Sequence, residues 1–219
     1  MNARRGIKLL AASALLFPGI VFAASDNLLA NGSFDNAAAP LANWRITYDL
    51  PGEGQYIGNE KLVSVVPMES GRKQVLRFEV SAKVAGWQGV KTDSAPVPIE
   101  PNGKYRFSAA AKTTGPNCRI MLEGYKWRPG IKPHANPELS ELRRMYKFAQ
   151  LYYGGAKGGD FGNVGRSWST ASMTLPDTKM TDLAKEKYNE VKFLVAHIVG
   201  IGGGGGVLYV DDVKIEKIN

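Results

Sequence analysis

The last stretch of the chain, Val207 to Ile218 (VLYVDDVKIEKI), constrains its fold most. Its apolar residues occupy alternate positions, the pattern of a β-strand with one face in a core: Val207, Tyr209, Val213 and Ile215. Asp211 falls on the same face. A carboxylate that points into a core is costly unless it is paired or bound to a metal, so Asp211 requires a partner elsewhere. We expect that partner near Asn27 to Asp35 (NLLANGSFD), at the other end of the mature chain.

The first residues have the composition of a secretory signal peptide. Basic residues at Arg4 and Arg5 precede an apolar run from Leu9 to Phe22, and the small residues Ala23 and Ala24 follow. This pattern predicts a signal peptide over residues 1–23, cleaved after Ala23, and therefore a secreted or periplasmic protein. Residues 24–219 are expected to form a single domain.

Charge and cysteine content exclude some classes of protein. The formal net charge is +8, and it falls to +5 once the three basic residues of the signal are removed. Such a mild excess, spread along an exported chain, argues against nucleic acid as a partner. No later segment is apolar enough to predict a membrane span. Cys118 is the only cysteine, so no internal disulfide is expected, and a small buried strand residue is its best interpretation.

Between the ends, short segments with alternating apolar and polar residues are separated by turn residues about every ten positions. They read KLVSVVP, QVLRFEV, WQGVKTDSAPVPI, KYRFSAAAKT, RIMLEGYKW, WSTASMTL and KFLVAHIV. Strands this short and regular predict an all-β sandwich. A loop or a short helix is expected around Asp182 to Tyr188.

One segment, about residues 128–165, departs from this pattern. Asn136-Pro137-Glu138 has the composition of a helix start, and Gly154-Gly155 would end the helix. Apolar residues between them recur at helical spacing: Leu139, Leu142, Tyr146, Ala149 and Tyr153. We therefore predict one helical segment inserted in the β-sandwich.

The order and spacing of several motifs resemble a known family. The motifs are NLLANGSFDN with the following Trp44, SGRKQVLRFEV, WQGVKTDSAPVPIEPNGKYRFSAAAKT, SWSTASMTL and VLYVDDVKI. Together they resemble the carbohydrate-binding modules of families four and nine, which have a galactose-binding-like jelly-roll fold. The resemblance covers nearly the whole mature chain except Arg128 to Gly165. It implies non-catalytic binding of a polysaccharide or glycan, with Trp44 and Trp168 as core aromatics.

The resemblance also implies a structural calcium ion that ties the first and last strands together. Calcium prefers oxygen ligands, and the positions that correspond in this chain are Asp35, Asp211, Asn31, Ser33 and Lys73, the last three in turns that would contribute backbone carbonyls. The alternative is that Asp35 and Asp211 cap turns or accept hydrogen bonds from backbone amides.

Sugar recognition requires flat apolar faces and planar polar groups. In Arg119 to Trp127, Ile120 and Leu122 alternate toward a core, and the opposite face carries aromatic and charged residues. The candidate ligand-binding residues are Trp127, Tyr125, Glu123, Trp87 and Arg128. The alternative is that the insert packs over Tyr125 and Trp127 and fills the groove.

The insert is rich in tyrosine and basic residues, which could extend the surface toward acidic or sulfated polysaccharides: Arg143, Arg144, Lys147, Tyr152 and Tyr153. An amphipathic lid with a solvated basic face is the better interpretation of the same residues.

Catalysis has little support in the sequence, so we expect no enzyme. His134 and His197 lie in no catalytic motif. A glycoside hydrolase would need two facing carboxylates, such as Glu123 with Glu138 or Asp160. The other alternative is a structural or interaction protein of the cell envelope, with other envelope proteins as partners.

Overall fold

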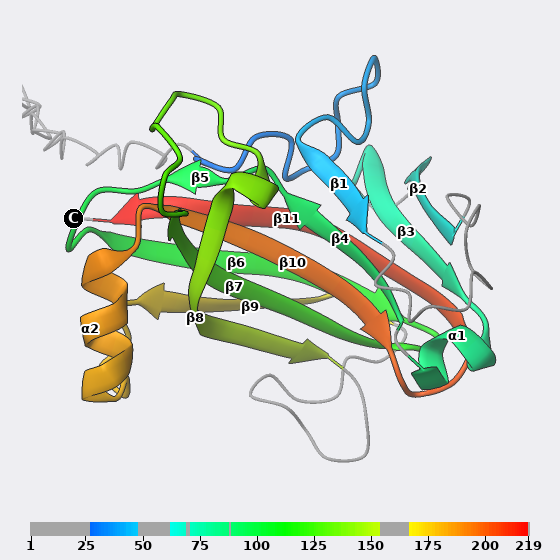
Figure 1. Cartoon of the computed structure of the whole chain (residues 1–219). Helices are drawn as coiled ribbons and strands as arrows, with labels where there is room; N and C mark the ends of the chain where they lie inside the picture. The colour runs from blue at the N-terminus through cyan, green and yellow to red at the C-terminus, as the bar shows by residue number, and fades with distance from the viewer. Residues whose placement is uncertain (1–26, 48–61, 69–70, 88, 154–166, 219) are drawn as a thin grey trace, which may run out of the picture.

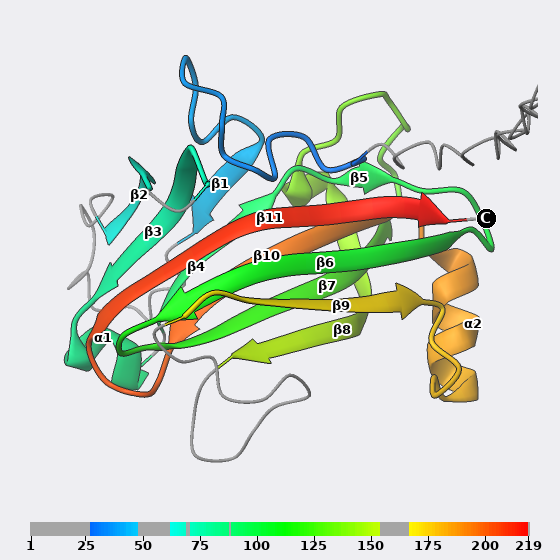
Figure 2. The same cartoon turned by 180° about the vertical axis from the view of Figure 1, so that it is seen from behind.

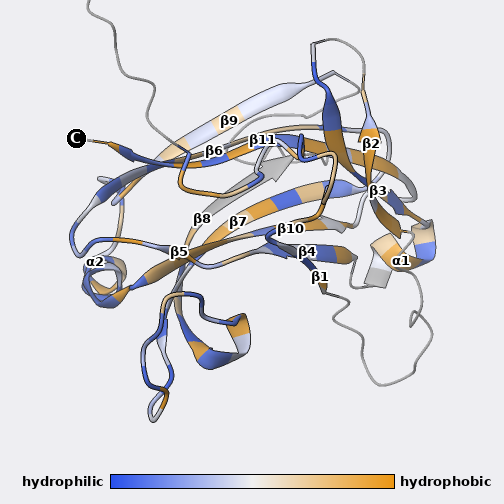
Figure 3. Cartoon of the chain, turned by 90° about the horizontal axis from the view of Figure 1, so that it is seen from above, coloured by the Kyte–Doolittle hydropathy of each residue, from blue (hydrophilic) through white to orange (hydrophobic). Residues whose placement is uncertain are grey.

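The computed structural model describes residues 27–47, 62–68, 71–87, 89–153 and 167–218. These residues form two antiparallel β-sheets packed face to face, which is the predicted jelly-roll β-sandwich (Figures 1 and 2). Figure 3 shows the sheets as two layers, with β6, β9 and β11 in one and β4, β7 and β10 in the other. The predicted signal peptide lies outside the described residues.

The first sheet has the strand order β1, β4, β10, β7, β8, and β5 pairs with one end of β10. Its strands are β1 (Trp44–Thr47), β4 (Val90–Ser94), β5 (Val97–Pro98), β7 (Asn117–Trp127), β8 (Leu142–Tyr153) and β10 (Phe193–Ile201). The second sheet has the order β2, β3, β11, β6, β9. Its strands are β2 (Val63–Pro67), β3 (Gln74–Val80), β6 (Lys104–Thr113), β9 (Ser169–Leu175) and β11 (Gly206–Ile218).

The helical elements are short. Helices α1 (Ala82–Trp87) and α2 (Asp182–Glu190) lie at opposite ends of the sandwich (Figure 1), and η2 (Leu139–Glu141) is one 3-10 turn. Helix α2 confirms the prediction around Asp182 to Tyr188; its N-cap Thr181 accepts a hydrogen bond from the Ala184 amide. No helix among the described residues is both long and apolar enough to cross a membrane.

The core lies between the two sheets. The inward alternation predicted for β7 is confirmed, since Ile120 and Leu122 are fully buried. They lie in one cluster with residues of the second sheet such as Phe78 and Phe107. Cys118, at the start of the same strand, is fully buried as predicted, and burial raises the pKa of its thiol.

The predicted segment Leu139 to Tyr153 is not a helix; this prediction is wrong beyond the single turn η2. Residues Leu142–Tyr153 instead form β8, which pairs antiparallel with β7 along nearly its whole length. Two register irregularities, after Leu122 and after Gly124 of β7, allow this pairing. In its described residues, 128–153, the insert therefore widens the first sheet by one edge strand.

The two ends of the described chain meet, as expected. The Leu28 amide donates to the Ile215 carbonyl at 2.8 Å, and the Val213 amide donates to the Gly32 carbonyl at 2.9 Å. The side chain of Asn27 bonds β11 twice, at Val213 O and Ile215 N, both at 3.0 Å. A Cβ at Gly32 would lie 2.0 Å from Val213 O, so this close approach requires glycine.

The prediction of which β11 side chains point inward is confirmed after the middle of the strand and wrong before it. Val213 and Ile215 are fully buried, but before them Leu208 and Val210 point inward in place of Val207 and Tyr209. A β-bulge between Asp211 and Lys214, with Asp212 at a φ of 50°, changes the phase of the strand. A bulge adds one residue to one strand, which moves later side chains to the other face.

The bulge places Asp211 against Arg72. The Arg72 guanidinium contacts the carboxylate of Asp211 and lies 2.6 Å from that of Asp212. The side chains of Arg72 and Asp211 are only 18% and 6% exposed. Arg72 also lies 4.2 Å from the ring centroid of Trp168, which is half-buried outside the main core cluster rather than in it as expected. The buried carboxylate of Asp211 is therefore paired with the guanidinium of Arg72.

We predict that Arg72→Met lowers the free energy of unfolding by about 3 kcal/mol, because removing one partner leaves the buried charge of Asp211 uncompensated. Urea denaturation measures this change. The double variant Arg72→Met/Asp211→Asn should recover part of the loss. A loss below about 0.5 kcal/mol, the scale of an exposed ion pair, would contradict a structural role for this contact.

Candidate ligand-binding site

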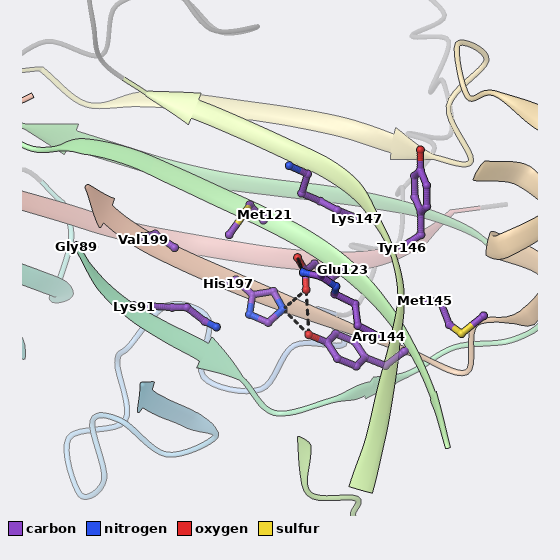
Figure 4. A pocket seen from close by; sticks show the side chains of 11 residues that line it. Gly89, Lys91, Met121, Glu123, Arg144, Met145, Tyr146, Lys147, His197 and Val199 are labelled. Atoms are coloured by element: carbon purple, nitrogen blue, oxygen red, sulfur yellow. Dashed lines mark hydrogen bonds and ion pairs between the residues drawn. The ribbon is translucent and has the colours of Figure 1, made fainter. Parts of the chain in front are cut away.

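A hollow of about 580 Å³ lies on the outer face of the first sheet, opposite the core. It crosses β4, β10, β7 and β8, so three central strands and one edge strand contribute to it (Figure 4). It is lined by Gly89, Lys91, Met121, Glu123, Tyr125, Arg144, Met145, Tyr146, Lys147, His197 and Val199. The insert contributes four of these residues through β8.

The floor of the hollow is a set of buried polar side chains that contact one another. His197 Nδ1 lies 2.6 Å from Asp93 Oδ1, and His197 Nε2 lies 3.3 Å from Glu123 Oε2. The Tyr125 hydroxyl donates to Glu123 Oε2 at 3.0 Å and lies 3.2 Å from His197 Nε2. All four side chains are buried. Each is satisfied by the others, as buried polar groups must be.

Strand register brings these residues together. His197 of β10 is directly opposite Asp93 of β4 on one side and Met121 of β7 on the other. Glu123 and Tyr125 follow Met121 at alternate positions of β7 and therefore share its face. Because Ile120 and Leu122 are fixed in the core, these three side chains must point away from it, toward the hollow.

The charges of the floor stabilise one another. Burial alone would raise the pKa of Glu123, but hydrogen bonds from His197 and Tyr125 and the charges of His197 and Arg144 lower it to about 2. Burial lowers the pKa of His197, but its bonds to Asp93 and Glu123 outweigh burial and raise it. Burial, with the charge and hydrogen bond of Glu123, raises the pKa of Tyr125. The floor therefore favours an ionised carboxylate, an imidazolium and a neutral phenol.

The rim carries cationic groups. Arg144 Nη1 donates to Glu123 Oε1 at 3.2 Å, and Lys91 Nζ lies 3.5 Å from Asp93 Oδ1. In Figure 4, Lys91 extends from β4 toward His197, and Arg144 lies beside Glu123. The ring of Tyr146, on β8, packs against the core and lies 5.2 Å from the ring of Phe148, so the apolar ring of the hollow is that of Tyr125. This site can therefore offer an apolar ring, hydrogen-bond acceptors and donors, and positive charge to one ligand.

The five predicted ligand-binding residues fall in different places. Glu123 and Tyr125 line the hollow. Trp127 lies outside it, half-buried, with its ring 5.3 Å from Phe193 and 5.1 Å from His134. Arg128 Nε donates to the Leu142 carbonyl. Trp87 ends helix α1, and its side chain is not among those described.

The sequence reasoning missed His197, Asp93 and Lys91. One signal was present, because His197 is the only polar side chain from Phe193 to Ile201, a strand that is otherwise apolar and, up to Gly200, buried. A histidine at the centre of a buried strand needs partners on the neighbouring strands. Those partners could not be identified without the register of β4 and β7.

The residues proposed for calcium do not fit an oxygen cage as they are arranged. Asp211 and Asp212 already hold the Arg72 guanidinium, and Asp35 accepts a hydrogen bond from the Gln74 amide. The carbonyl of Asn31 accepts from the Phe34 amide and the Trp44 indole, and that of Lys73 accepts from the Met68 amide.

Among the described residues, no group of three or more His, Cys, Asp or Glu side chains is placed to hold a metal ion. Ser33 lies in the turn beside Gly32, whose carbonyl accepts from Val213. Calcium at these residues therefore stays a prediction, and the contacts agree with the alternative that both aspartates bond protein groups.

No protein-family model matches this sequence. A search of the curated proteins finds no match either.

Solved structures share the fold. A cyclase from Fischerella sp. TAU in complex with 4-(1H-indol-3-yl)butan-2-one is similar with a TM-score of 0.55 and 12% identity, over 90% of this chain and 98% of that one. The family 11 module of a cellulosomal cellulase of Clostridium thermocellum has a TM-score of 0.50 and 11% identity, over 90% and 97%. A family 4 carbohydrate-binding module has a TM-score of 0.46 and 13% identity, over 87% of this chain and 99% of that one. The chain has the jelly-roll fold of carbohydrate-binding modules.

The charged floor predicts a maximum of stability in mildly acidic solution. The lowered pKa of Glu123 gives stability above its ordinary value of 4.5, which is lost as the pH falls toward 2. The raised pKa of His197 gives stability below its ordinary value of 6.5, which is lost as the pH rises through the folded-state pKa. Urea unfolding across this pH range measures both effects. In His197→Gln the decline at higher pH should shrink; an unchanged decline would contradict the assignment to His197.

Calcium is tested by thermal unfolding. A cation that binds only the folded protein raises its melting temperature. Because the Arg72 guanidinium already contacts the carboxylates of both Asp211 and Asp212, we expect the same melting temperature in excess calcium and in EDTA. Magnesium at the same concentration controls for ionic strength. A rise that is specific to calcium would contradict this expectation and support the calcium site.

Proposed function

We propose that this chain is an exported, non-catalytic protein that binds a polysaccharide or glycan in the hollow over β4, β10, β7 and β8. The observation that carries the proposal is the placement of a satisfied polar floor, Glu123 with His197, on the outer face of a sheet whose inner face is the core. Such a floor is rigid, because each group is held by neighbouring strands. A rigid set of acceptors and donors suits the hydroxyl groups of a sugar.

Aromatic and apolar groups supply the rest of such a site. The ring of Tyr125 and the thioether of Met121 line the hollow beside the polar groups, and a ring or thioether can pack against the C–H face of a pyranose. The fold adds support, because carbohydrate-binding modules share it. The cyclase of the same fold binds another kind of molecule, so the proposal depends on the chemistry of the hollow.

The alternative of a closed groove is supported in part, because Tyr125 is buried and Trp127 lies beside His134 of the insert. It required the insert to cover Tyr125 and Trp127. Leu142 and Leu139 do pack beside them, but the Tyr125 hydroxyl still reaches the floor and the hollow is present. The described part of the insert contributes a wall of the hollow through β8.

A catalytic function is less well supported than binding. Both ring nitrogens of His197 contact carboxylates, so neither is placed to exchange a proton with a ligand. Of the carboxylates named for a hydrolase, Glu123 lines this hollow and Glu138 lines a second one of about 280 Å³. Asp160 lies outside the described residues. His134 lies 3.1 Å from Glu141 in the loop before β8.

The matched variants Arg144→Ala and Arg143→Ala test this site. Both change one exposed arginine of β8 by the same amount, but only Arg144 lines the hollow. We expect Arg144→Ala to weaken binding by about tenfold or more, the value of a hydrogen bond from a charged group. Arg143→Ala should change it less than twofold. Affinity electrophoresis in xylan, β-glucan, galactan and polygalacturonate would measure binding, with thermal unfolding to confirm that both variants fold.

Equal retention of the two variants in a polysaccharide that slows the wild type would place the binding site elsewhere on the molecule. If no polysaccharide slows the wild type, and titration with short oligosaccharides of the same sugars shows no heat of binding, the proposed function is wrong.

A further inference from the structure

The described residues that line the hollow include more cationic than anionic side chains. Among the described residues that line it, apart from His197, three side chains are cationic and one is anionic. Lys91 comes from β4, Arg144 and Lys147 come from β8, and Glu123 comes from β7. The side chains of Arg144 and Lys147 are exposed, and that of Lys91 is 24% exposed. The cations therefore border the opening from two opposite sides.

The buried pair beneath adds no negative excess. Asp93 is the second carboxylate of the site, and it contacts His197 Nδ1 at 2.6 Å and Lys91 Nζ at 3.5 Å. Asp93 and the imidazolium of His197 compensate each other. Cationic side chains therefore outnumber carboxylates among the described residues that line the hollow. A concave site with one sign of charge focuses its field and attracts ligands of the opposite sign.

Arg144 is placed to bind an anion directly. Its side chain is 66% exposed at the rim. The contact to Glu123 uses Nη1 and fixes the orientation of the guanidinium. A guanidinium has five N–H donors in a planar fork, which matches the two oxygens of a carboxylate. Glu123, held ionised, is in turn an acceptor for hydroxyl groups.

We propose that the glycan bound in this hollow is acidic, with uronate units whose carboxylate is held by Arg144 and whose hydroxyls donate to Glu123. This inference rests on the proposed function and specifies its substrate class. Lys147 and Lys91 supply the field around the carboxylate. The hydroxyls of a neutral sugar can donate to Glu123, but such a sugar has no carboxylate to accept from Arg144. It therefore lacks the stronger, charge-assisted hydrogen bonds.

The test compares ligands of the same length and ring that differ in whether the carboxyl group is charged. Trigalacturonate and its fully methyl-esterified form have the same length and ring, and isothermal titration at low and moderate salt measures both. We expect the acid to bind about tenfold more tightly than the ester at low salt. The preference should fall as salt screens the rim. A sulfated galactotriose is the third ligand, because sulfate shares the charge but has three oxygens rather than a planar pair.

Variants separate the hollow from the general basicity of the chain. Lys147→Gln at the rim and Lys185→Gln on helix α2 remove the same charge, and Lys185 lies away from the hollow on an exposed face. We expect Lys147→Gln to reduce the preference for acid over ester about threefold, as expected for one rim charge. Lys185→Gln should leave the preference unchanged.

The outcomes are distinct. Equal affinity for acid and ester overturns the acidic-glycan inference and leaves the proposed function in place. Tighter binding of the sulfated ligand than of trigalacturonate overturns the assignment to uronates. An equal effect of Lys147→Gln and Lys185→Gln shows attraction to the whole basic surface and also overturns it. If no neutral or acidic saccharide binds, the inference fails together with the proposed function.

Discussion

The outer face of the first sheet depends on one buried contact, that between His197 and its two carboxylates. Asp93 and Glu123 come from the strands on either side of β10, so the imidazole joins three strands through side chains as well as through the backbone. Without it, two carboxylates would stand in a poorly solvated place with like charge. With it, a polar surface becomes as rigid as the sheet beneath. The geometry of the hollow follows from this contact.

The second sheet also contains a buried carboxylate that is compensated by a cationic side chain. There the bulge of β11 would leave the carboxylate of Asp211 without compensation, and Arg72 supplies the positive charge. Both sheets therefore place an organic cation against two carboxylates, imidazolium in one and guanidinium in the other. In both cases the cation is part of the chain, so its position is set by folding and does not depend on the concentration of an ion.

Much of the fold could be predicted from the sequence, but less of the site. Period-two alternation identified β7 and its two faces, and Asn27 to Asp35 was correctly expected to meet β11. The segment from Leu139 to Tyr153 misled because its apolar spacing fits a helix, whereas the open edge of β7 offered a full ladder of hydrogen bonds. The partners of His197 lie more than seventy residues away along the chain. Only the register of pairing, which local pattern does not fix, brings them together.

Because β8 is an edge strand, the residues that would choose among ligands are separate from those that pack the fold. The groups that would choose among ligands, Arg144 and Lys147, stand on an outermost strand with exposed side chains, whereas the floor belongs to interior strands. Exchange of an exposed residue on an outer strand disturbs little of the packing. A few substitutions in β8 could thus give descendants of this protein new ligand preferences. The β-sandwich and the buried contacts of His197 with Asp93 and Glu123 would stay unchanged.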